Sequence, residues 1–325
     1  MRRILSLLCG ALILGPAIAR AQFAGAPSMK VAIVKNAYSG NRGEPELSKG
    51  PDALETGGIA GMASKAGFEL AASRAVQLTP EEDRAYGAWN RMGLANGHLG
   101  RAVAAVLRNG EFPIGLLANC NSLLGMLAGL QHSGPDTQPL RVGLVWIDAH
   151  ADFNTPETTL SGMLGGMPVA VATGLCLTRF RLQSGLDPAL PFAYVTMLGI
   201  RDADPLEREL IDRHRIELVP AEALRPPFSG IHAQMKRLSG WTDLIYVHID
   251  MDVLDPAEVS GHPLTVRGGP SSQELASGLE VMFQYRKAAA LGVASYPFQS
   301  DPGGKSLKAA CNLVEGCLRG VKASR

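Results

Sequence analysis

Two short segments of the chain bring together side chains of the kinds that bind metal ions. Residues 148–152 read DAHAD and follow the apolar run 141–147, and residues 250–252 read DMD and follow the apolar run 244–249. Because the side chains of an extended chain alternate between two faces, the charged members of each segment can point the same way. If the two runs are neighbouring strands, their ends form one cluster, whose members are Asp148, His150, Asp152, Asp250 and Asp252.

Four of these five side chains are carboxylates, and their mutual repulsion restricts what the cluster can be. Like charges at close range raise one another's pKa, so four carboxylates need a compensating charge. Two divalent cations supply it, and oxygen-rich ligation with one imidazole suits Mn²⁺ or Mg²⁺ better than Zn²⁺ or copper. Two such ions can hold a hydroxide as a nucleophile. One Asp-x-Asp can also be a solvated turn, but two groups directly after apolar strands favour a metal-dependent enzyme.

The pattern along the chain predicts the elements that position this cluster. Continuous apolar runs alternate with helical segments, which is typical of a parallel sheet covered on both faces. We therefore predict an α/β fold with three α/β/α layers, a central mainly parallel sheet, and a site at the carboxyl ends of its strands. Residues 36–51 are expected to form a loop. The predicted strands are 30–34, 68–70, 112–117, 141–147, 192–200, 217–219, 244–249 and 288–294, and the predicted helices are 54–66, 89–107, 122–130, 167–174, 205–214, 231–238, 272–283 and 305–318.

The composition is that of a globular protein with balanced charge. The chain has 325 residues, of which 46% are hydrophobic, and its 31 basic and 30 acidic residues give a net charge of +1. No stripe of Lys and Arg is present, so no nucleic-acid partner is expected. A chain of this length can form one α/β unit, and we expect residues 22–325 to be a single domain.

The first 21 residues have the three parts of an export signal. Arg2 and Arg3 precede an apolar stretch, 4–18, and the small residues of 19–21 form a cleavage site. The apolar stretch is shorter than the roughly 20 residues that span a bilayer, which disfavours a transmembrane anchor. We expect 1–21 to be a cleaved signal peptide and the mature protein to be periplasmic or secreted, without a membrane attachment.

Four cysteines follow the signal: Cys120, Cys176, Cys311 and Cys317. No pair has C-x-x-C spacing, so no zinc ribbon is expected, and disulfide connectivity cannot be read from the sequence. For Cys311 and Cys317 the favoured interpretation is that of small buried hydrophobic side chains.

The motifs resemble those of one enzyme family, the ureohydrolases or arginase family. Residues 148–152 and 248–256 resemble its two signature motifs, and 50–51 its early Gly-Pro. Residues 199–204 resemble its substrate loop, and 268–274 its Gly-Gly…Glu motif. The resemblance implies an arginase-like fold and hydrolysis of linear C–N bonds in guanidino or amidino compounds.

The resemblance also implies a ligand set for two Mn²⁺ ions. Asp148 and Asp250 would bridge both ions, His150 and Asp252 would complete one site, and Asp152 would help to complete the other. A bridging hydroxide would attack the guanidinium carbon and release urea and an amine.

Substrate contacts are implied in the same way. Glu274 would contact the guanidinium group. Asn154 and Ser161 would bind an α-carboxylate and Asp204 an α-amino group, which favours an amino-acid substrate. Asn154 and Ser161 can also be ordinary loop-capping residues.

Two departures from the family pattern alter these expectations. The family has a metal-binding histidine where this chain has Cys120 or, with a shift of one residue, Asn121, and either change would weaken one metal site. Arginases also carry a proton-shuttling histidine where this chain has Gly165. His262 is our candidate for the missing proton donor, because histidine titrates near neutral pH and this one lies between the second aspartate group and Glu274. A surface-loop histidine is the alternative.

Two functions remain open at this point. The first is a metal-dependent guanidino- or amidino-hydrolase, and the second is a binding protein or pseudoenzyme that keeps the fold without turnover. Cys120 and Gly165 favour the second. The features that favour the first are the intact residues of the motifs, which are Asp148, His150, Asp152, Asp250, Asp252 and Glu274. The resemblance also implies a homo-oligomer, a trimer or a hexamer.

Overall fold

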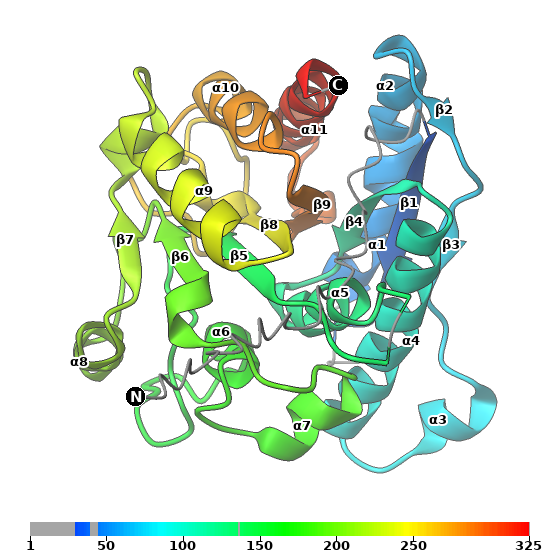
Figure 1. Cartoon of the computed structure of the whole chain (residues 1–325), viewed down its shortest axis with the longest axis vertical. Helices are drawn as coiled ribbons and strands as arrows, with labels where there is room; N and C mark the ends of the chain where they lie inside the picture. Colours follow the sequence, from blue (N-terminus) through cyan, green and yellow to red (C-terminus); the bar gives the residue numbers. More distant parts are fainter. Residues whose placement is uncertain (1–29, 40–44, 136, 325) are drawn as a thin grey trace, which may run out of the picture.

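The protein is built around one sheet in which every strand pairing is parallel (Figure 1). The computed structural model describes residues 30–39, 45–135 and 137–324, so the predicted signal peptide lies outside the described residues. The strand order is β2-β1-β4-β9-β8-β5-β6-β7, and β3 also pairs with β1. The strands are β1 (Lys30–Asn36), β2 (Glu69–Leu70), β3 (Arg74–Ala75), β4 (Phe112–Leu117), β5 (Val142–Ile147), β6 (Val195–Leu198), β7 (Glu217–Val219), β8 (Leu244–Asp250) and β9 (Ala288–Ala294).

Helices cover both faces of this sheet, which confirms the predicted three-layer α/β/α class (Figure 1). Their bounds are α1 (Pro45–Leu54), α2 (Ala60–Lys65), α3 (Pro80–Arg84), α4 (Ala88–Arg108), α5 (Leu123–Gln131), α6 (Pro168–Ala172), α7 (Thr178–Gln183), α8 (Pro205–His214), α9 (Ser229–Trp241), α10 (Ser272–Phe283) and α11 (Lys305–Ala323). A one-turn π-helix, Glu55–Ile59, joins α1 to α2.

The core has two halves because alternate strand residues face opposite sides of the sheet. In β5, Val145 and Ile147 pack with residues of α9, α10 and α11, whereas Leu144 and Trp146 pack with residues of α4, α5 and α6. The central strands are therefore mainly apolar on both faces, as the sequence pattern indicated, and their polar exceptions are Thr196 in β6 and His248 and Asp250 in β8.

The chain departs from the predicted elements around 36–51. That segment was expected to be a loop, but α1 begins at Pro45 and contains Pro51. A side chain at Gly50 would place its Cβ 3.2 Å from the carbonyl oxygen of Tyr296, so the glycine permits close packing of the helix rather than ending it. The predicted strand 192–200 is also shorter, since Phe192–Tyr194 forms a 3₁₀ turn before β6.

In the part of the chain that the structure describes, no helix has both the length and the apolar character needed to cross a bilayer.

Candidate metal centre

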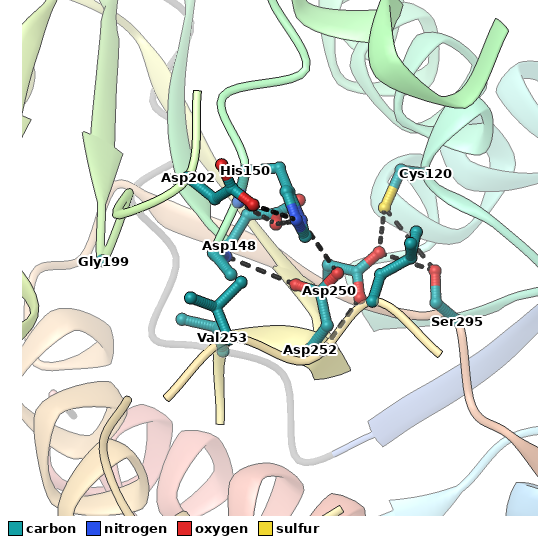
Figure 2. Close-up of polar contacts among 12 residues, drawn as sticks. Cys120, Asp148, His150, Gly199, Asp202, Asp250, Asp252, Val253 and Ser295 are labelled. Carbon is teal, nitrogen blue, oxygen red and sulfur yellow. Dashed lines mark hydrogen bonds and ion pairs between the residues drawn. The ribbon is translucent and has the colours of Figure 1, made fainter. Parts of the chain in front are cut away.

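The two aspartate groups lie side by side at the carboxyl edge of the sheet. Strands β5 and β8 are neighbours in register, with Ile147 paired to Ile249, so both strands end at the same level of the sheet. On the other side of β8, Asp250 pairs with Ala294 at the end of β9. The residues after β4, β5, β8 and β9 therefore converge on one cluster, which Figure 2 shows.

One half of this cluster, which we call the His150 side, consists of Asp148, His150 and Asp252. The Nδ1 atom of His150 lies 3.1 Å from Oδ2 of Asp252 and 3.5 Å from Oδ1 of Asp148 (Figure 2). Both carboxylates are almost fully buried, whereas the imidazole is 25% exposed. The His150 side therefore offers two carboxylates and one imidazole next to solvent.

The other half, which we call the Cys120 side, consists of Cys120, Asp148 and Asp250. The thiol of Cys120 donates to Oδ2 of Asp250 at 2.8 Å, and the hydroxyl of Ser295 donates to the same oxygen at 2.6 Å (Figure 2). Of the two residues considered for this position in the sequence, Cys120 is the one whose side chain reaches the aspartates. The side-chain oxygen of Asn121 is buried without a hydrogen-bond partner.

Ligand atoms in these groups are close enough to hold cations. Three sets, each with its ligand atoms within 4.8 Å of one another, occur among the described residues: the His150 side, the Cys120 side, and Asp250 with Asp252 and His262. Asp148, Asp250 and Asp252 each belong to two of the three sets, as carboxylates shared between neighbouring ions would. The donor set of the His150 side fits a hard divalent ion, whereas the sulfur of the Cys120 side fits a softer one.

The electrostatics of the cluster also fit a bound cation. Burial and the neighbouring aspartates raise the pKa of Asp148, and burial together with Asp252 raises that of Asp250. Burial raises the pKa of Asp252 too, but contact with His150 outweighs it and the net shift is downward. Burial would lower the pKa of His150, yet Asp148 and Asp252 raise it to about 11. Without a metal, the imidazolium is thus the main local counter-charge, and a divalent cation can replace it.

Burial and the nearby carboxylates also shift the pKa of the Cys120 thiol. Burial, followed by the charges of Asp250 and Asp148, raises its pKa well above the ordinary value. A thiolate is the reactive and the ligating form of cysteine. Without a cation this residue is therefore a poor nucleophile, and a bound cation is what would favour its ionised form.

Asp152 lies at the edge of the cluster and is in none of the three sets. Its backbone adopts φ 48°, a left-handed conformation that is uncommon outside glycine. Its carbonyl oxygen accepts a hydrogen bond from Val169 N at 3.0 Å, which holds this conformation. Burial and the charge of Asp250 raise the pKa of its carboxyl group. Its predicted role as a ligand stays a prediction.

His262 reaches the cluster from the loop that follows β8. The side chain is buried, and its Nε2 lies 3.9 Å from Oδ1 of Asp250. Its Nδ1 accepts the backbone N–H of Leu264 at 3.3 Å, so the neutral ring carries its hydrogen on Nε2, toward Asp250. The predicted alternative, a surface-loop histidine, is wrong, because burial places His262 beside the aspartates.

Glu274 lies at the start of α10, where it forms a capping box. Its carboxylate accepts hydrogen bonds from the backbone N–H and hydroxyl of Ser271 and from Nε of Arg225, and Ser271 in turn accepts the N–H of Glu274. Neither partner is a residue of the cluster, and the predicted contact of Glu274 with a guanidinium group stays a prediction.

Two of the three predicted substrate residues are hydrogen-bonded to each other. The amide Nδ2 of Asn154 donates to Oδ2 of Asp204 at 3.1 Å, and Asn154 accepts the hydroxyl of Thr158. Asp204 also caps α8. Ser161 is exposed and its hydroxyl lies 3.4 Å from that of Thr159. Asn154 and Asp204 thus form one polar pair, to which Ser161 makes no hydrogen bond, and the predicted substrate contacts of all three stay predictions.

Three residues that support the cluster were missed in the sequence. Arg201 donates to the carbonyl oxygens of Asp252, Val253 and Val266, which ties the substrate loop to the loop that follows β8. Ser295 binds Asp250. His248 Nε2 lies 3.3 Å from the sulfur of Cys120, and its position two residues before Asp250 was the available signal.

Comparisons with known proteins agree with this geometry. The arginase family model matches residues 29–319. An arginase from Bacillus caldovelox is 30% identical over 190 residues, which cover 58% of this chain and 62% of that enzyme. An arginase from Brevibacillus brevis is 28% identical over 244 residues, which cover 73% of this chain and 80% of that enzyme.

Solved structures of an arginase and of a formimidoylglutamase share the fold of this chain. The Entamoeba histolytica arginase in complex with L-ornithine superposes with a TM-score of 0.79 at 23% identity, and the match covers 90% of this chain and 98% of that one. The formimidoylglutamase of Bacillus subtilis superposes with a TM-score of 0.69 at 16% identity, and the match covers 91% and 88% of the two chains.

Proposed function

The chain belongs to the arginase family of hydrolases, and from this premise we propose that it hydrolyses a linear C–N bond in a small guanidino or amidino compound with the help of two metal ions. The observation that carries the proposal is the pair of overlapping ligand sets, the His150 side and the Cys120 side, which share Asp148. Overlapping sets of this kind suit two neighbouring ions held by shared carboxylates. We propose Mn²⁺ for the His150 side because its donors are hard.

The metal supplies Lewis acidity: when bound, it lowers the pKa of a water molecule and so provides a nucleophile at neutral pH. Asp148 and Asp250, which follow or end two adjacent strands, would hold the metal centre, and His150 would lie on its solvent side. Hydrolysis would add water to the guanidinium or amidinium carbon and break the C–N bond to the leaving amine. The leaving amine must receive a proton. The products from a guanidino substrate are urea and an amine.

The substrate end of the proposal rests on Asn154 and Asp204. Asp204 is an anionic acceptor suited to an ammonium group, and the Asn154 amide is a donor suited to a carboxylate. In the structure they bind each other, so an amino-acid substrate would exchange this hydrogen bond for two of its own. L-Arginine is therefore the first compound to test.

A second candidate function is a binding protein without turnover. Cys120 and Gly165 favour it, because one family ligand is changed and no side chain at Gly165 can move a proton. A Cβ at Gly165 would meet no other atom within 4 Å, so nothing else fills the space beside this residue.

Release of urea and ammonia from a panel of guanidino and amidino compounds separates the two functions. We expect metal-depleted protein to be inactive and to gain activity on one or more compounds when Mn²⁺ is added. Asp250→Asn is the matched control and should stay inactive with the metal. Metal-loaded protein that binds the compounds but releases neither product would establish the binding protein and refute the hydrolase.

A further inference from the structure

A row of buried polar side chains lies behind the Cys120 side. Tyr246 and His248 both come from β8 and, two residues apart, face the same side of the sheet. The Tyr246 hydroxyl lies 2.8 Å from Nδ1 of His248, and Nε2 of His248 lies 3.3 Å from the sulfur of Cys120. Tyr246 and His248 are fully buried, and Cys120 is 3% exposed. The row therefore connects the sheet interior to the centre without access for solvent.

The direction of the hydrogen bonds follows from Tyr246. Among the described residues, the buried hydroxyl of Tyr246 has no hydrogen-bond acceptor other than Nδ1 of His248, so the hydroxyl proton points at that nitrogen. An imidazole that accepts at Nδ1 carries its hydrogen on Nε2. That hydrogen points at the sulfur of Cys120. The thiol sulfur of Cys120 thus accepts a hydrogen bond from the N–H of His248 on one side and faces Asp250 on the other.

The neighbouring residues keep this row in place. The indole of Trp146 stacks on the His248 ring, with centroids 4.5 Å apart and an interplanar angle of 6°. In β9, a Cβ at Gly292 would lie 2.0 Å from the Tyr246 hydroxyl oxygen, so only glycine leaves room for the phenol. The arrangement depends on three adjacent strands and orients Cys120 rather than merely burying it.

We propose that Cys120 is a sulfur ligand in the metal position of the Cys120 side, that His248 is a positioning residue which donates its Nε2–H to that sulfur, and that this position consequently selects a softer divalent ion, such as Co²⁺, over Mn²⁺. The inference rests on the metal centre of the proposed function. It adds to that function the sulfur ligand Cys120 and the hydrogen bond from His248 that orients it. Partners that hydrogen-bond to a ligand fix its orientation and tune its affinity for the metal.

The chemistry favours this selection. A thiolate is a soft ligand and Mn²⁺ is a hard ion, whereas Co²⁺ and Zn²⁺ accept sulfur readily. Asp148 belongs to both sides and does not discriminate between them. His150 is the corresponding nitrogen donor on the other side. The two positions should therefore bind different ions from a mixture.

Titration of the metal-depleted full-length protein with Co²⁺ tests the proposal, because a sulfur–cobalt bond gives a charge-transfer absorption in the near ultraviolet. We expect the wild type to develop this band and Cys120→Ser to bind one Co²⁺ fewer without it. His248→Phe should shift the band and weaken Co²⁺ binding at this position about tenfold, as partners of metal ligands typically do. Tyr246→Phe, which removes only a hydroxyl, should shift the band less.

Cys317→Ser is the matched control, because Cys317 is equally buried but lies in α11 with no charged partner responsible for its raised pKa. Its band and Co²⁺ affinity should equal those of the wild type. Co²⁺ that binds to the wild type without the band would refute the sulfur ligand while leaving the metal centre intact. An unchanged band and affinity in His248→Phe would refute the positioning role. A wild type that binds no Co²⁺ and no Mn²⁺ would overturn the metal centre itself, and with it the proposed function.

Discussion

The His150 side and the Cys120 side share Asp148, yet their remaining donors differ in chemistry and in access. On the His150 side the third donor is a partly exposed imidazole that two carboxylates keep protonated in the absence of metal. On the Cys120 side it is a buried thiol that a neutral histidine supports from behind. Burial lowers the pKa of that histidine, His248, to about 3, so it stays uncharged.

The difference shows how one edge of a parallel sheet can combine hard and soft ligands. Residues that leave adjacent strands at the same level meet whatever their chemistry, because the backbone register fixes their positions. A change of side chain at one strand end, such as Cys120, therefore alters one half of the centre and leaves the other half in place. The supporting residues must change with it, and Tyr246, His248 and Gly292 are those residues here.

The largest expected effect comes from removing a carboxylate that belongs to two of the three ligand sets. Asp250→Asn should abolish metal binding, because Asp250 contributes to the Cys120 side and to the set with Asp252 and His262. Asp152→Asn, the comparison variant, should retain at least one ion, since Asp152 is in none of the three sets. Metal content is measured after gel filtration. Equal, wild-type content in both variants would contradict the shared role of Asp250.

Protons should compete with metal at the His150 side. The folded pKa of His150 is raised to about 11, so its imidazole is protonated at neutral pH and must lose a proton before it can bind an ion. Affinity for Mn²⁺ should rise about tenfold per pH unit between pH 6 and 8, since one proton leaves for each ion bound. Calorimetry in buffers of different ionisation enthalpy measures the released protons. Binding without proton release would mean that His150 is not a ligand.

His262 lies beside Asp250, which places it where the two sides meet, and its removal should affect turnover more than metal binding. His262→Ala should lower kcat about tenfold or more, as loss of a proton-transfer group does, while metal content stays unchanged. His214→Ala, a histidine that stacks on Phe192 away from the cluster, serves as control. Wild-type kcat in His262→Ala would leave this histidine with a packing role only.

Glu274 should contribute to stability rather than to substrate binding. Glu274→Gln weakens the capping box of α10 and the contact with Arg225, and we expect a loss of about 1 kcal/mol in the free energy of unfolding. The Michaelis constant should change less than twofold. Glu82→Gln, in the capping box of α3, is the matched control. A large rise of the Michaelis constant in Glu274→Gln alone would contradict this expectation and support the guanidinium contact that the resemblance implies.

The sequence was sufficient for the sheet and for the two aspartate groups, because both depend on local pattern. Apolar runs followed by DAHAD and DMD indicate buried strands and their ends without any knowledge of distant contacts. The α1 helix was missed because residues 36–51 are rich in Gly, Asn, Ser and Glu, which is typical of a loop. In the structure, Gly50 lies in that helix and permits its packing against Tyr296.

The rest depended on contacts between residues far apart in the chain. The choice between Cys120 and Asn121 was open until the strand ends were placed together. His248 was visible only as part of a motif, because its role requires Cys120, which is 128 residues away. The capping role of Glu274 was not anticipated, because a motif match names a residue but not the direction of its side chain, which turns back to Ser271.

The most direct test of the account is a crystal structure of the protein exposed to equal concentrations of Mn²⁺ and Co²⁺, with anomalous diffraction recorded at the absorption edge of each metal. We predict two peaks in the strand-end cluster, with manganese next to His150 and cobalt next to the sulfur of Cys120. Two peaks with the same mixture of metals would contradict the chemical difference between the sides. No anomalous peak among Asp148, Asp250 and their neighbours would contradict the metal centre.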